Sequence, residues 1–443
     1  MPNKTFGLDR REFVAGLGAA ALLQCAPRHL SAQAAAPGRR RLVLEARAAV
    51  MAPAPGDPEI PIWALQSSPP EALPRFTKGD ELELTVQNSL PIPAVLNWYG
   101  FDGTNLPEPL LARSPVPPGA KESLLIPLRQ AGTFVCDLRL MGDAQARPLP
   151  AQPIIVLENE PVAVDRDEVL LIEEWRLRPD GTPIGPGIDP GNAPPIYTLN
   201  GRLALDIAAR PRERLRFRFI SGCQRTVMAL KIEGHDVRVM AIDGEPAEPF
   251  PARNGAVLLP PGGRVDAFID VGASPRATPI LLHDGKEARQ IGRVVIGAEP
   301  PLRGAALPPA PVLPSNGLPD ALDLKNALRF DLALGGTPLG WMHPENFTAS
   351  AAPAFRAKAG RPVVLALSNR GDKSAIFHLH GHHFRLLDRL DDGWKPFWLD
   401  TVAIESGQTQ RIAFAADYAG SWLIETMATD WAAPRLVRWY GVQ

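Results

Sequence analysis

The chain has 443 residues, which is enough for about three domains of ordinary size. Hydrophobic residues make up 45% and charged residues 21%, so the chain can bury a core and is not disordered as a whole. The formal net charge of −1 argues against a protein that holds nucleic acid or a membrane surface by positive charge, and we expect no nucleic-acid partner. With 49 prolines and 38 glycines, the sequence disfavours long helices and favours short strands joined by turns.

Residues 1–36 are typical of an export signal. Arg10 and Arg11 form a twin-arginine core, an apolar run follows at 14–23, and 32–34 offers an A-x-A cleavage site. The apolar run is too short to cross a bilayer, so we expect no membrane span. A short amphipathic helix is the alternative interpretation. Export by the twin-arginine translocase predicts a periplasmic protein that folds before transport.

Two of the three cysteines, Cys136 and Cys223, lie beyond this signal. They could form a disulfide in an oxidising compartment. Their separation in the sequence gives no geometric support for pairing, and two buried free thiols are an equal alternative.

Three segments with the pattern of strands recur at intervals of about 130–150 residues, which predicts three copies of one β module. Segments 81–86 and 214–220 alternate polar and apolar residues, whereas 361–367 is more continuously apolar. The proline-rich stretch 301–318 is expected to be a semi-rigid linker. We therefore predict an all-β chain of three Greek-key β-sandwich domains in series, at 37–160, 161–300 and 319–443.

The last third contains the histidine-rich segment His378-Leu379-His380-Gly381-His382-His383-Phe384. On a strand, His378, His380 and His382 would project from one face. Neutral imidazoles suit copper, zinc and iron, so such a face is a candidate metal site. An H-x-H pair alone is a weak signal for a metal, and the alternative is a polar strand end that binds nothing.

The surrounding sequence resembles the multicopper oxidases, the laccase-like family of three cupredoxin domains. Segment 96–100 is similar to the H-W-H-G motif of that family, and 131–139 to its G-T-F-W-Y-H-S-H segment. The resemblance continues through 234–235, 242–244, 261–266, 398–401, Gly407 and 415–422. It therefore spans nearly the whole chain beyond the signal and implies cupredoxin-like domains.

The sequence departs from that family at its metal ligands. The family binds four coppers, a type 1 copper and a trinuclear cluster, with about ten histidines and one cysteine. Without His29 of the signal, seven of the eight histidines remain. The resemblance places Ala375, Thr426, Trp431 and Leu436 at type 1 positions, and Asn97, Tyr99, Asp137, Arg139, His378, His380, Glu425 and Met427 at cluster positions. We therefore expect neither the four-copper set nor four-electron reduction of dioxygen.

Three interpretations of the altered centre are open. In the first, Arg139 pairs with Asp137 or Glu425, and the imidazoles complete a hydrogen-bond network without metal. In the second, His378 and His380 bind one transition-metal ion, with Glu425 or Asp137 as a further ligand. In the third, Arg139 and the imidazoles form a pocket for a small anion.

The family resemblance, together with the loss of the copper ligands, favours a non-catalytic periplasmic binding or scaffold protein without a cofactor. One copper-free member of the family, a twin-arginine-exported protein of the cell-division machinery, is similar in export signal, domain number and lost copper ligands. The alternative is an oxidoreductase with a residual mononuclear site at His378 and His380. A subunit that docks on another periplasmic or respiratory protein is a third interpretation. The sequence names neither a protein partner nor a small ligand.

Overall fold

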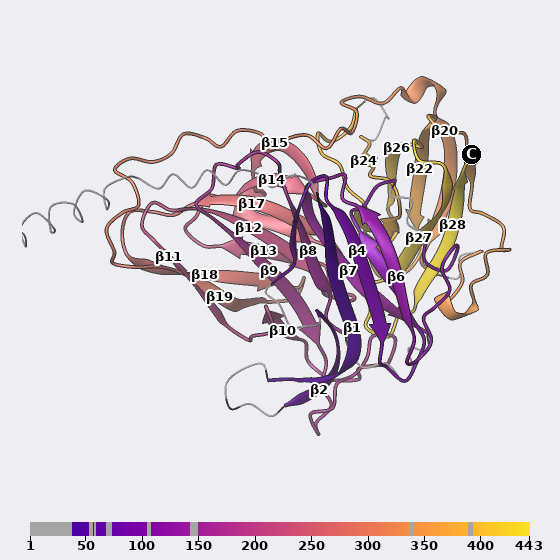
Figure 1. Ribbon diagram of the computed structural model, residues 1–443, viewed down its shortest axis with the longest axis horizontal. Helices are drawn as coiled ribbons and strands as arrows, with labels where there is room; N and C mark the ends of the chain where they lie inside the picture. The colour runs from indigo at the N-terminus through magenta and orange to yellow at the C-terminus, as the bar shows by residue number, and fades with distance from the viewer. Residues whose placement is uncertain are drawn as a thin grey trace, which may run out of the picture. The chain divides into compact units, whose positions relative to one another are not determined.

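The computed structural model of the chain describes most residues beyond the predicted export signal (Figure 1), namely 38–52, 56, 59–67, 73–103, 108–141, 149–336, 340–388 and 393–443. The signal predicted at 1–36 lies outside the described residues, and the described residues from 38 onward belong to one compact unit. The described elements are strands and three short 3-10 helices, η2 (Arg253–Gly255), η3 (Leu324–Asn326) and η4 (Pro344–Asn346). Within this part of the chain, no helix has the length and apolar character needed to cross a membrane.

The strands form six sheets, which pack as three β-sandwiches. In the first sandwich, the two sheets have the orders β2-β1-β4-β6 and β3-β8-β7-β5. The bounds are β1 Arg39–Met51, β2 Ile60–Ser67, β3 Arg75–Thr77, β4 Glu81–Asn88, β5 Ala94–Tyr99, β6 Lys121–Pro127, β7 Gly132–Leu140 and β8 Gln152–Leu157. Apolar side chains from both sheets share one buried core.

The second sandwich has sheets of order β10-β9-β12-β17-β14-β15 and β11-β19-β18-β13-β16. The bounds of its first strands are β9 Arg166–Trp175, β10 Ile196–Leu199, β11 Leu205–Ala209, β12 Arg214–Ser221, β13 Met228–Ile232 and β14 Arg238–Ile242. Those of the rest are β15 Glu245–Pro251, β16 Ala256–Leu259, β17 Arg264–Asp270, β18 Arg276–His283 and β19 Ala288–Ile296.

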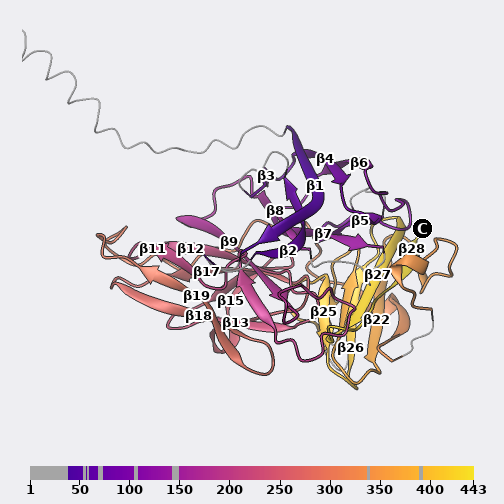
Figure 2. The ribbon, with the colours of Figure 1, turned by 90° about the horizontal axis from the view of Figure 1, so that it is seen from below.

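The third sandwich lies at the C-terminal end of the chain and is coloured orange to yellow (Figure 2). Its sheets have the orders β20-β22-β26-β24 and β21-β28-β27-β23-β25. The bounds are β20 Leu328–Leu334, β21 Arg356–Ala357, β22 Pro362–Asn369, β23 Ala375–Leu379, β24 Arg385–Leu386, β25 Thr401–Ile404, β26 Thr409–Ala415, β27 Gly420–Ala428 and β28 Arg435–Val442.

The three predicted repeat segments are strands in equivalent places. They coincide with β4, β12 and β22, and each pairs in parallel with the first strand of its sandwich. Each also pairs antiparallel with a later strand of the same sheet. This common pairing confirms the all-β fold of three repeated sandwiches. The domain limits stay predictions, and 301–318 contains no strand.

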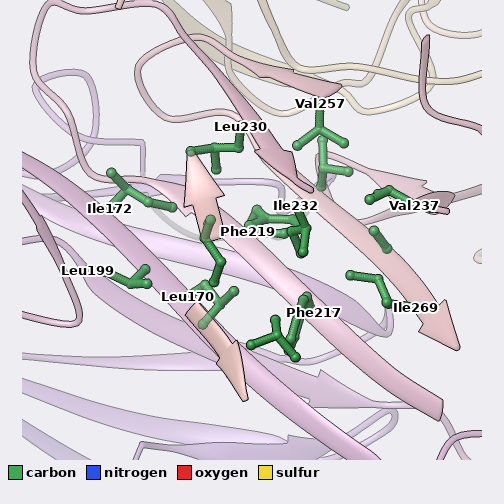
Figure 3. Close-up of a cluster of buried hydrophobic side chains, with 14 of the residues drawn as sticks. Leu170, Ile172, Leu199, Phe217, Phe219, Leu230, Ile232, Val237, Val257 and Ile269 are labelled. Atoms are coloured by element: carbon green, nitrogen blue, oxygen red, sulfur yellow. The ribbon is translucent and has the colours of Figure 1, made fainter. Parts of the chain in front are cut away.

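Strand β12 alternates polar and apolar residues, but its polar face is buried and not exposed to solvent. Phe217 and Phe219 point into the core of the second sandwich (Figure 3). Arg216 and Arg218 project from the opposite face, and both donate to Oδ2 of Asp266, at 2.5 and 3.0 Å. Arg218 also donates to the Thr133 hydroxyl of β7 at 2.9 Å. The first sandwich therefore covers this face, and ion pairs satisfy its buried charges.

The two cysteines beyond the signal do not pair. Cys136 on β7 and Cys223, just after β12, are both buried free thiols. Burial raises the pKa of each thiol well above its ordinary value, so both are inert side chains of the core.

Candidate functional site

Strands β5 and β7 of the first sandwich carry four of the predicted site residues. Asn97 lies directly opposite Asp137 in the antiparallel register. Tyr99 and Arg139 each lie two positions further along their own strands, and alternate residues of a strand share a face. All four side chains are buried.

The third sandwich supplies the other half of the site. His378 on β23 lies opposite Glu425 on β27. His380 follows directly after β23, and its backbone N–H donates to the carbonyl of Leu423 at 3.1 Å. The structure therefore brings the predicted residues of the two sandwiches to one buried place.

One expectation about the histidine-rich segment is wrong. His382 does not share a strand face with His378 and His380, because β23 ends at Leu379 and Gly381 takes a positive φ of 74°. The chain turns there, and Nδ1 of His382 lies 2.7 Å from the Tyr440 hydroxyl, away from the site.

Arg139 is the central contact between the two sandwiches. Its Nε and Nη2 donate to the two carboxylate oxygens of Glu425 at 3.0 and 2.7 Å. Its Nη1 donates to Asp137, and its Nη2 also donates to the Tyr99 hydroxyl at 2.8 Å. Burial alone would lower the pKa of Arg139, but the carboxylates of Asp137 and Glu425 raise it well above its ordinary value. The guanidinium is therefore a fixed buried cation.

A second guanidinium, that of Arg435 on β28, was missed by the sequence analysis. Its Nη1 donates to Oε2 of Glu425 at 2.8 Å. Burial raises the pKa of the Glu425 carboxyl, but Arg139, Arg435 and His380 together hold it well below its ordinary value. Arg435 lies opposite Met427 on the β27–β28 ladder. The sequence could have pointed to Arg435 only if the pairing register of β27 and β28 had been predicted, because that register places Arg435 beside a predicted site position.

The protonation of His378 follows from its partners. Its Nδ1 lies 2.9 Å from the Thr401 hydroxyl and 3.1 Å from the carbonyl of Asp400. The Thr401 hydroxyl donates its proton to Oδ1 of Asp400 at 2.7 Å, so both partners of Nδ1 are acceptors. Nδ1 therefore carries the proton. Burial lowers the pKa of His378 to about 3, so the ring is neutral and Nε2 presents a lone pair.

His380 has a different environment. Its Nδ1 lies 2.5 Å from Oε1 of Glu108, a loop residue that the sequence analysis missed because no motif marks it. Burial lowers the pKa of His380, but Glu108 and then Glu425 raise it, and the net shift is upward. Its Nε2 lies 3.8 Å from Oε1 of Glu425, which is too long for a hydrogen bond.

The centre contains buried polar atoms that have no hydrogen-bond partner among the described residues: Oδ1 and Nδ2 of Asn97, Oδ1 of Asp137, and Nε2 of both His378 and His380. The histidines line a cavity of about 30 Å³, and Tyr99 and Glu425 border one of about 10 Å³. These volumes are on the scale of single water molecules. Across the described ranges, no group of three or more His, Cys, Asp or Glu side chains is arranged to hold a metal ion.

The geometry also bears on the predicted anion pocket. Arg139 lines a cavity of about 50 Å³ together with Asp137 and Arg435. His378 and His380 line a separate cavity. Arg139 and the two imidazoles thus do not share one cavity, as a pocket built around all three would require.

Three further predicted positions lie within the strands of the third sandwich. Ala375 is the first residue of β23 and carries only a methyl group. The Thr426 hydroxyl donates to the carbonyl of Ile376 at 2.9 Å, so it is occupied inside its own sheet. Leu436 lies opposite Thr426 on β28. These side chains pack and hydrogen-bond as ordinary strand residues.

The remaining two positions contact loops of the second sandwich, between β9 and β10 and between β12 and β13. The indole N–H of Trp431 donates to the carbonyl of Gly185 at 3.0 Å, and the Arg176 guanidinium lies 5.6 Å from its ring centre. The thioether sulfur of Met427 accepts from Arg225 at 3.5 Å. Both side chains therefore hold neighbouring parts of the chain together.

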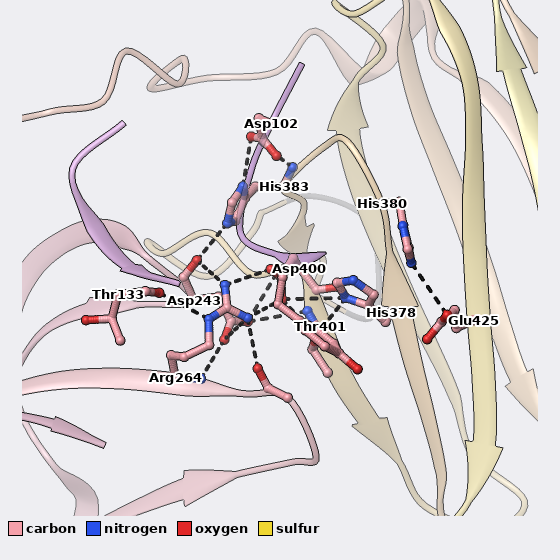
Figure 4. A network of polar contacts seen from close by, with 12 residues as sticks. Asp102, Thr133, Asp243, Arg264, His378, His380, His383, Asp400, Thr401 and Glu425 are labelled. Atoms are coloured by element: carbon pink, nitrogen blue, oxygen red, sulfur yellow. Dashed lines mark hydrogen bonds and ion pairs between the residues drawn. The ribbon is translucent and has the colours of Figure 1, made fainter. Parts of the chain in front are cut away.

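A second buried network lies beside the first and joins all three sandwiches (Figure 4). His383 Nδ1 lies 2.8 Å from Oδ2 of Asp102, and its Nε2 lies 2.9 Å from the carbonyl of Asp243. Both partners are acceptors, so both ring nitrogens carry protons and His383 is an imidazolium. Burial lowers the pKa of His383, but Asp102, with smaller contributions from Glu245 and Asp400, raises it to about 10.

Arg264 on β17 is the second cation of this network. It donates to both carboxylate oxygens of Asp400 at 3.0 and 2.8 Å, and to the backbone carbonyl of Thr133 at 3.2 Å. One side chain of the second sandwich thus binds the third sandwich through Asp400 and the first through Thr133.

Comparison with known proteins agrees with this architecture. Two models of the multicopper oxidase family match the chain, at residues 171–282 and 321–441. A curated multicopper oxidase of Mycobacterium tuberculosis, MmcO, is 24% identical over 469 aligned positions, which cover 89% of this chain and 86% of that protein. The chain belongs to the multicopper oxidase family. Laccase-1 of Thanatephorus cucumeris, 25% identical, matches 45% of this chain and 39% of its own length.

Solved multicopper oxidases share the fold. The crystal structure of one from Pseudomonas thermotolerans is 23% identical, covers 92% of this chain and 100% of that chain, and has a TM-score of 0.77. The multicopper oxidase McoA of Aquifex aeolicus is 15% identical, with coverage of 92% and 98% and a TM-score of 0.73. The three-sandwich fold of the family is therefore kept at low sequence identity.

Proposed function

We propose that this chain is a copper-depleted member of the multicopper oxidase family that acts as a non-catalytic periplasmic binding or scaffold protein. The observation that carries the proposal is the buried guanidinium of Arg139, which is bonded to Asp137, Tyr99 and Glu425. The family resemblance assigns all four residues to trinuclear-cluster positions. A permanent cation of the protein would then stand where the family places copper.

The chemistry of these side chains does not fit the trinuclear cluster. A guanidinium has no lone pair to offer a metal and stays charged at every relevant pH. A copper ion beside Arg139 would meet unscreened repulsion in a buried site. Glu425 accepts from both Arg139 and Arg435, so its negative charge is already balanced.

The residues at the type 1 positions do not fit either. A type 1 copper needs one thiolate and two imidazoles. Ala375, Thr426 and Trp431 offer a methyl group, a hydroxyl and an indole. The hydroxyl of Thr426 donates to a carbonyl of its own sheet, and the indole of Trp431 donates to Gly185. We therefore derive no electron-transfer step for this chain.

Oxygen consumption tests the loss of catalysis. The purified protein would be incubated with copper and then assayed with a phenolic donor and with a reduced metal ion, beside a copper-loaded laccase. We expect consumption no higher than that of the protein-free blank. Consumption that depends on copper and rises with protein concentration would contradict the proposal. If oxygen consumption stays at the level of the blank, affinity capture from periplasmic extract is the next experiment, and it would search for the protein partner.

The periplasmic location is part of the same proposal, and it rests on the twin-arginine core of the first 36 residues. Changing Arg10 and Arg11 to Lys should leave the protein in the cytoplasm, whereas the unchanged chain should fractionate with the periplasm. Equal fractionation of the two proteins would mean that the twin-arginine translocase does not export this chain.

A second candidate function is an oxidoreductase with one residual metal ion. The observation that favours it is the pair of buried Nε2 atoms of His378 and His380, neither of which has a partner among the described residues. These two atoms would hold the metal, with Glu425, whose Oε1 lies 3.8 Å from Nε2 of His380, as a further ligand. Iron, zinc or manganese would suit such a set and would supply Lewis-acid or redox chemistry. Arg139 and Arg435 compete with the metal for the Glu425 carboxylate.

A further inference from the structure

The turn between β14 and β15 lies where all three sandwiches meet. It consists of Asp243 and Gly244, with φ angles of 52° and 88°, as in a two-residue hairpin turn. Gly244 packs against Gly132 of β7 so closely that a Cβ atom on Gly132 would lie 2.3 Å from the Gly244 carbonyl oxygen. No larger residue than glycine fits at Gly132 without moving this turn.

Asp243 joins the turn to the third sandwich. Its Oδ2 accepts from the backbone N–H groups of Asp400 and Thr401 at 3.1 and 3.3 Å. Its carbonyl oxygen accepts from Nε2 of His383 at 2.9 Å. Its Oδ1 accepts from the backbone N–H of Arg264 at 3.0 Å, and burial together with the nearby Asp400 carboxylate raises the pKa of Asp243 to about 6.

Glu245, the first residue of β15, joins the turn to the first sandwich and to the linker. Its Oε1 accepts from Nε2 of Gln130 at 3.1 Å and from Nδ2 of Asn316 at 3.3 Å. Asn316 belongs to the proline-rich stretch 301–318. Its amide also makes a reciprocal pair with the backbone of Ala131, at 2.9 and 2.8 Å. One carboxyl therefore holds three separate parts of the chain.

Among the described residues, no cationic side chain forms a hydrogen bond or an ion pair with Glu245. The side chain is 3% exposed, and its two hydrogen-bond partners are neutral amides. Burial raises the pKa of Glu245 to about 7, His383 opposes this shift, and Asp102 adds to it. The other titratable groups that interact with it are Lys78 and Tyr418, and Asp243 lies two residues before it in the chain.

We propose that Glu245 is a pH-sensitive latch, which holds Gln130 and Asn316 together when protonated and loosens this junction when ionised. An ionised carboxylate that is buried without a hydrogen-bonded cation is costly, and opening the junction gives it water. The open state would release Asn316 and with it the backbone amide of Ala131. The latch does not depend on whether the chain binds a metal.

Hydrogen exchange of the full-length mature protein tests this latch. Exchange at Ala131 and at 315–317 would be measured between pH 5 and pH 8 and corrected for intrinsic rates. The opening equilibrium should rise by up to about tenfold per pH unit until the pH reaches about 7, because the open state releases one more proton. Glu245→Gln should remove this slope. Glu248→Gln, at an exposed position of the same strand, should keep it.

Two results would overturn the latch: a slope that persists in Glu245→Gln, or a pH-dependent rise that is equal in the core strands and thus reports global unfolding. If Glu245→Gln does not fold, Asn316→Ala gives an independent test. It removes the linker contact and leaves Glu245 in place, so Ala131 should exchange fast at every pH. Unchanged protection of Ala131 in Asn316→Ala would equally refute the proposal.

Discussion

The guanidinium of Arg139 and the carboxylate of Glu425 form a two-point ion pair between residues 286 positions apart in the chain. This pair joins β7 of the first sandwich to β27 of the third. Both side chains are buried, so solvent does not weaken the pair as it weakens ion pairs at the surface. The same two side chains, the family resemblance implies, stand where copper ligands would otherwise converge.

Removal of Arg139 should destabilise the protein strongly. In Arg139→Met, the buried carboxylates of Asp137 and Glu425 lose their shared cation, and the free energy of unfolding should fall by about 3–5 kcal/mol. Denaturant titration measures this fall. The matched control is Arg41→Met, which removes an exposed ion pair with Glu83 and should cost less than about 1 kcal/mol. Equal losses in the two variants would mean that Arg139 contributes no special stability.

His383 predicts a loss of stability in alkaline solution. Its pKa is raised to about 10 in the folded protein, above the ordinary value near 6.5, so its contribution is complete below about pH 6.5 and is lost as pH rises toward 10. The free energy of unfolding should therefore fall by about 1.4 kcal/mol per pH unit in this window. The difference between the wild type and His383→Gln isolates this slope. His283→Gln, at an exposed position, should reproduce the wild-type profile.

The buried carboxyl of Glu173 on β9 should make the free energy of unfolding depend on pH in a lower range. Burial raises its pKa to about 8, opposed by a hydrogen bond from the backbone of Ala151. The folded protein therefore keeps a proton that the unfolded chain releases above about pH 4.5. Stability should fall between about pH 4.5 and 8 and level off above that range. In Glu173→Gln, the slope of the free energy of unfolding against pH should be smaller by up to about 1.4 kcal/mol per pH unit. Parallel profiles for the two proteins would show that Glu173 ionises freely.

The fold was predictable because its signals are local. The alternation at 81–86 and 214–220 and the apolar run at 361–367 each mark a central strand of one sandwich. The burial of Arg216 and Arg218 was not visible in the same pattern, because it depends on the first sandwich covering that face of β12. Ion pairs across sandwiches leave no periodicity in the sequence.

The candidate site was predictable to the extent that motifs mark it. The motifs of the first and last sandwiches located Asn97, Asp137, Arg139 and Glu425, and the structure brings these residues together. Glu108 was missed because it lies in a loop and meets His380 only through tertiary contact. The turn of the chain at Gly381 also escaped the strand pattern, which is why His382 was placed on the wrong face.

The metal content of the exported, purified protein tests the central claim most directly. The protein would be incubated with copper, zinc, iron and manganese, freed of unbound metal and measured by elemental analysis, with a His378→Ala, His380→Ala double variant beside it. The account predicts less than about a tenth of an equivalent of any metal in both proteins. Near one equivalent that is lost in the double variant would establish the mononuclear site instead. Four coppers per chain would contradict the account altogether.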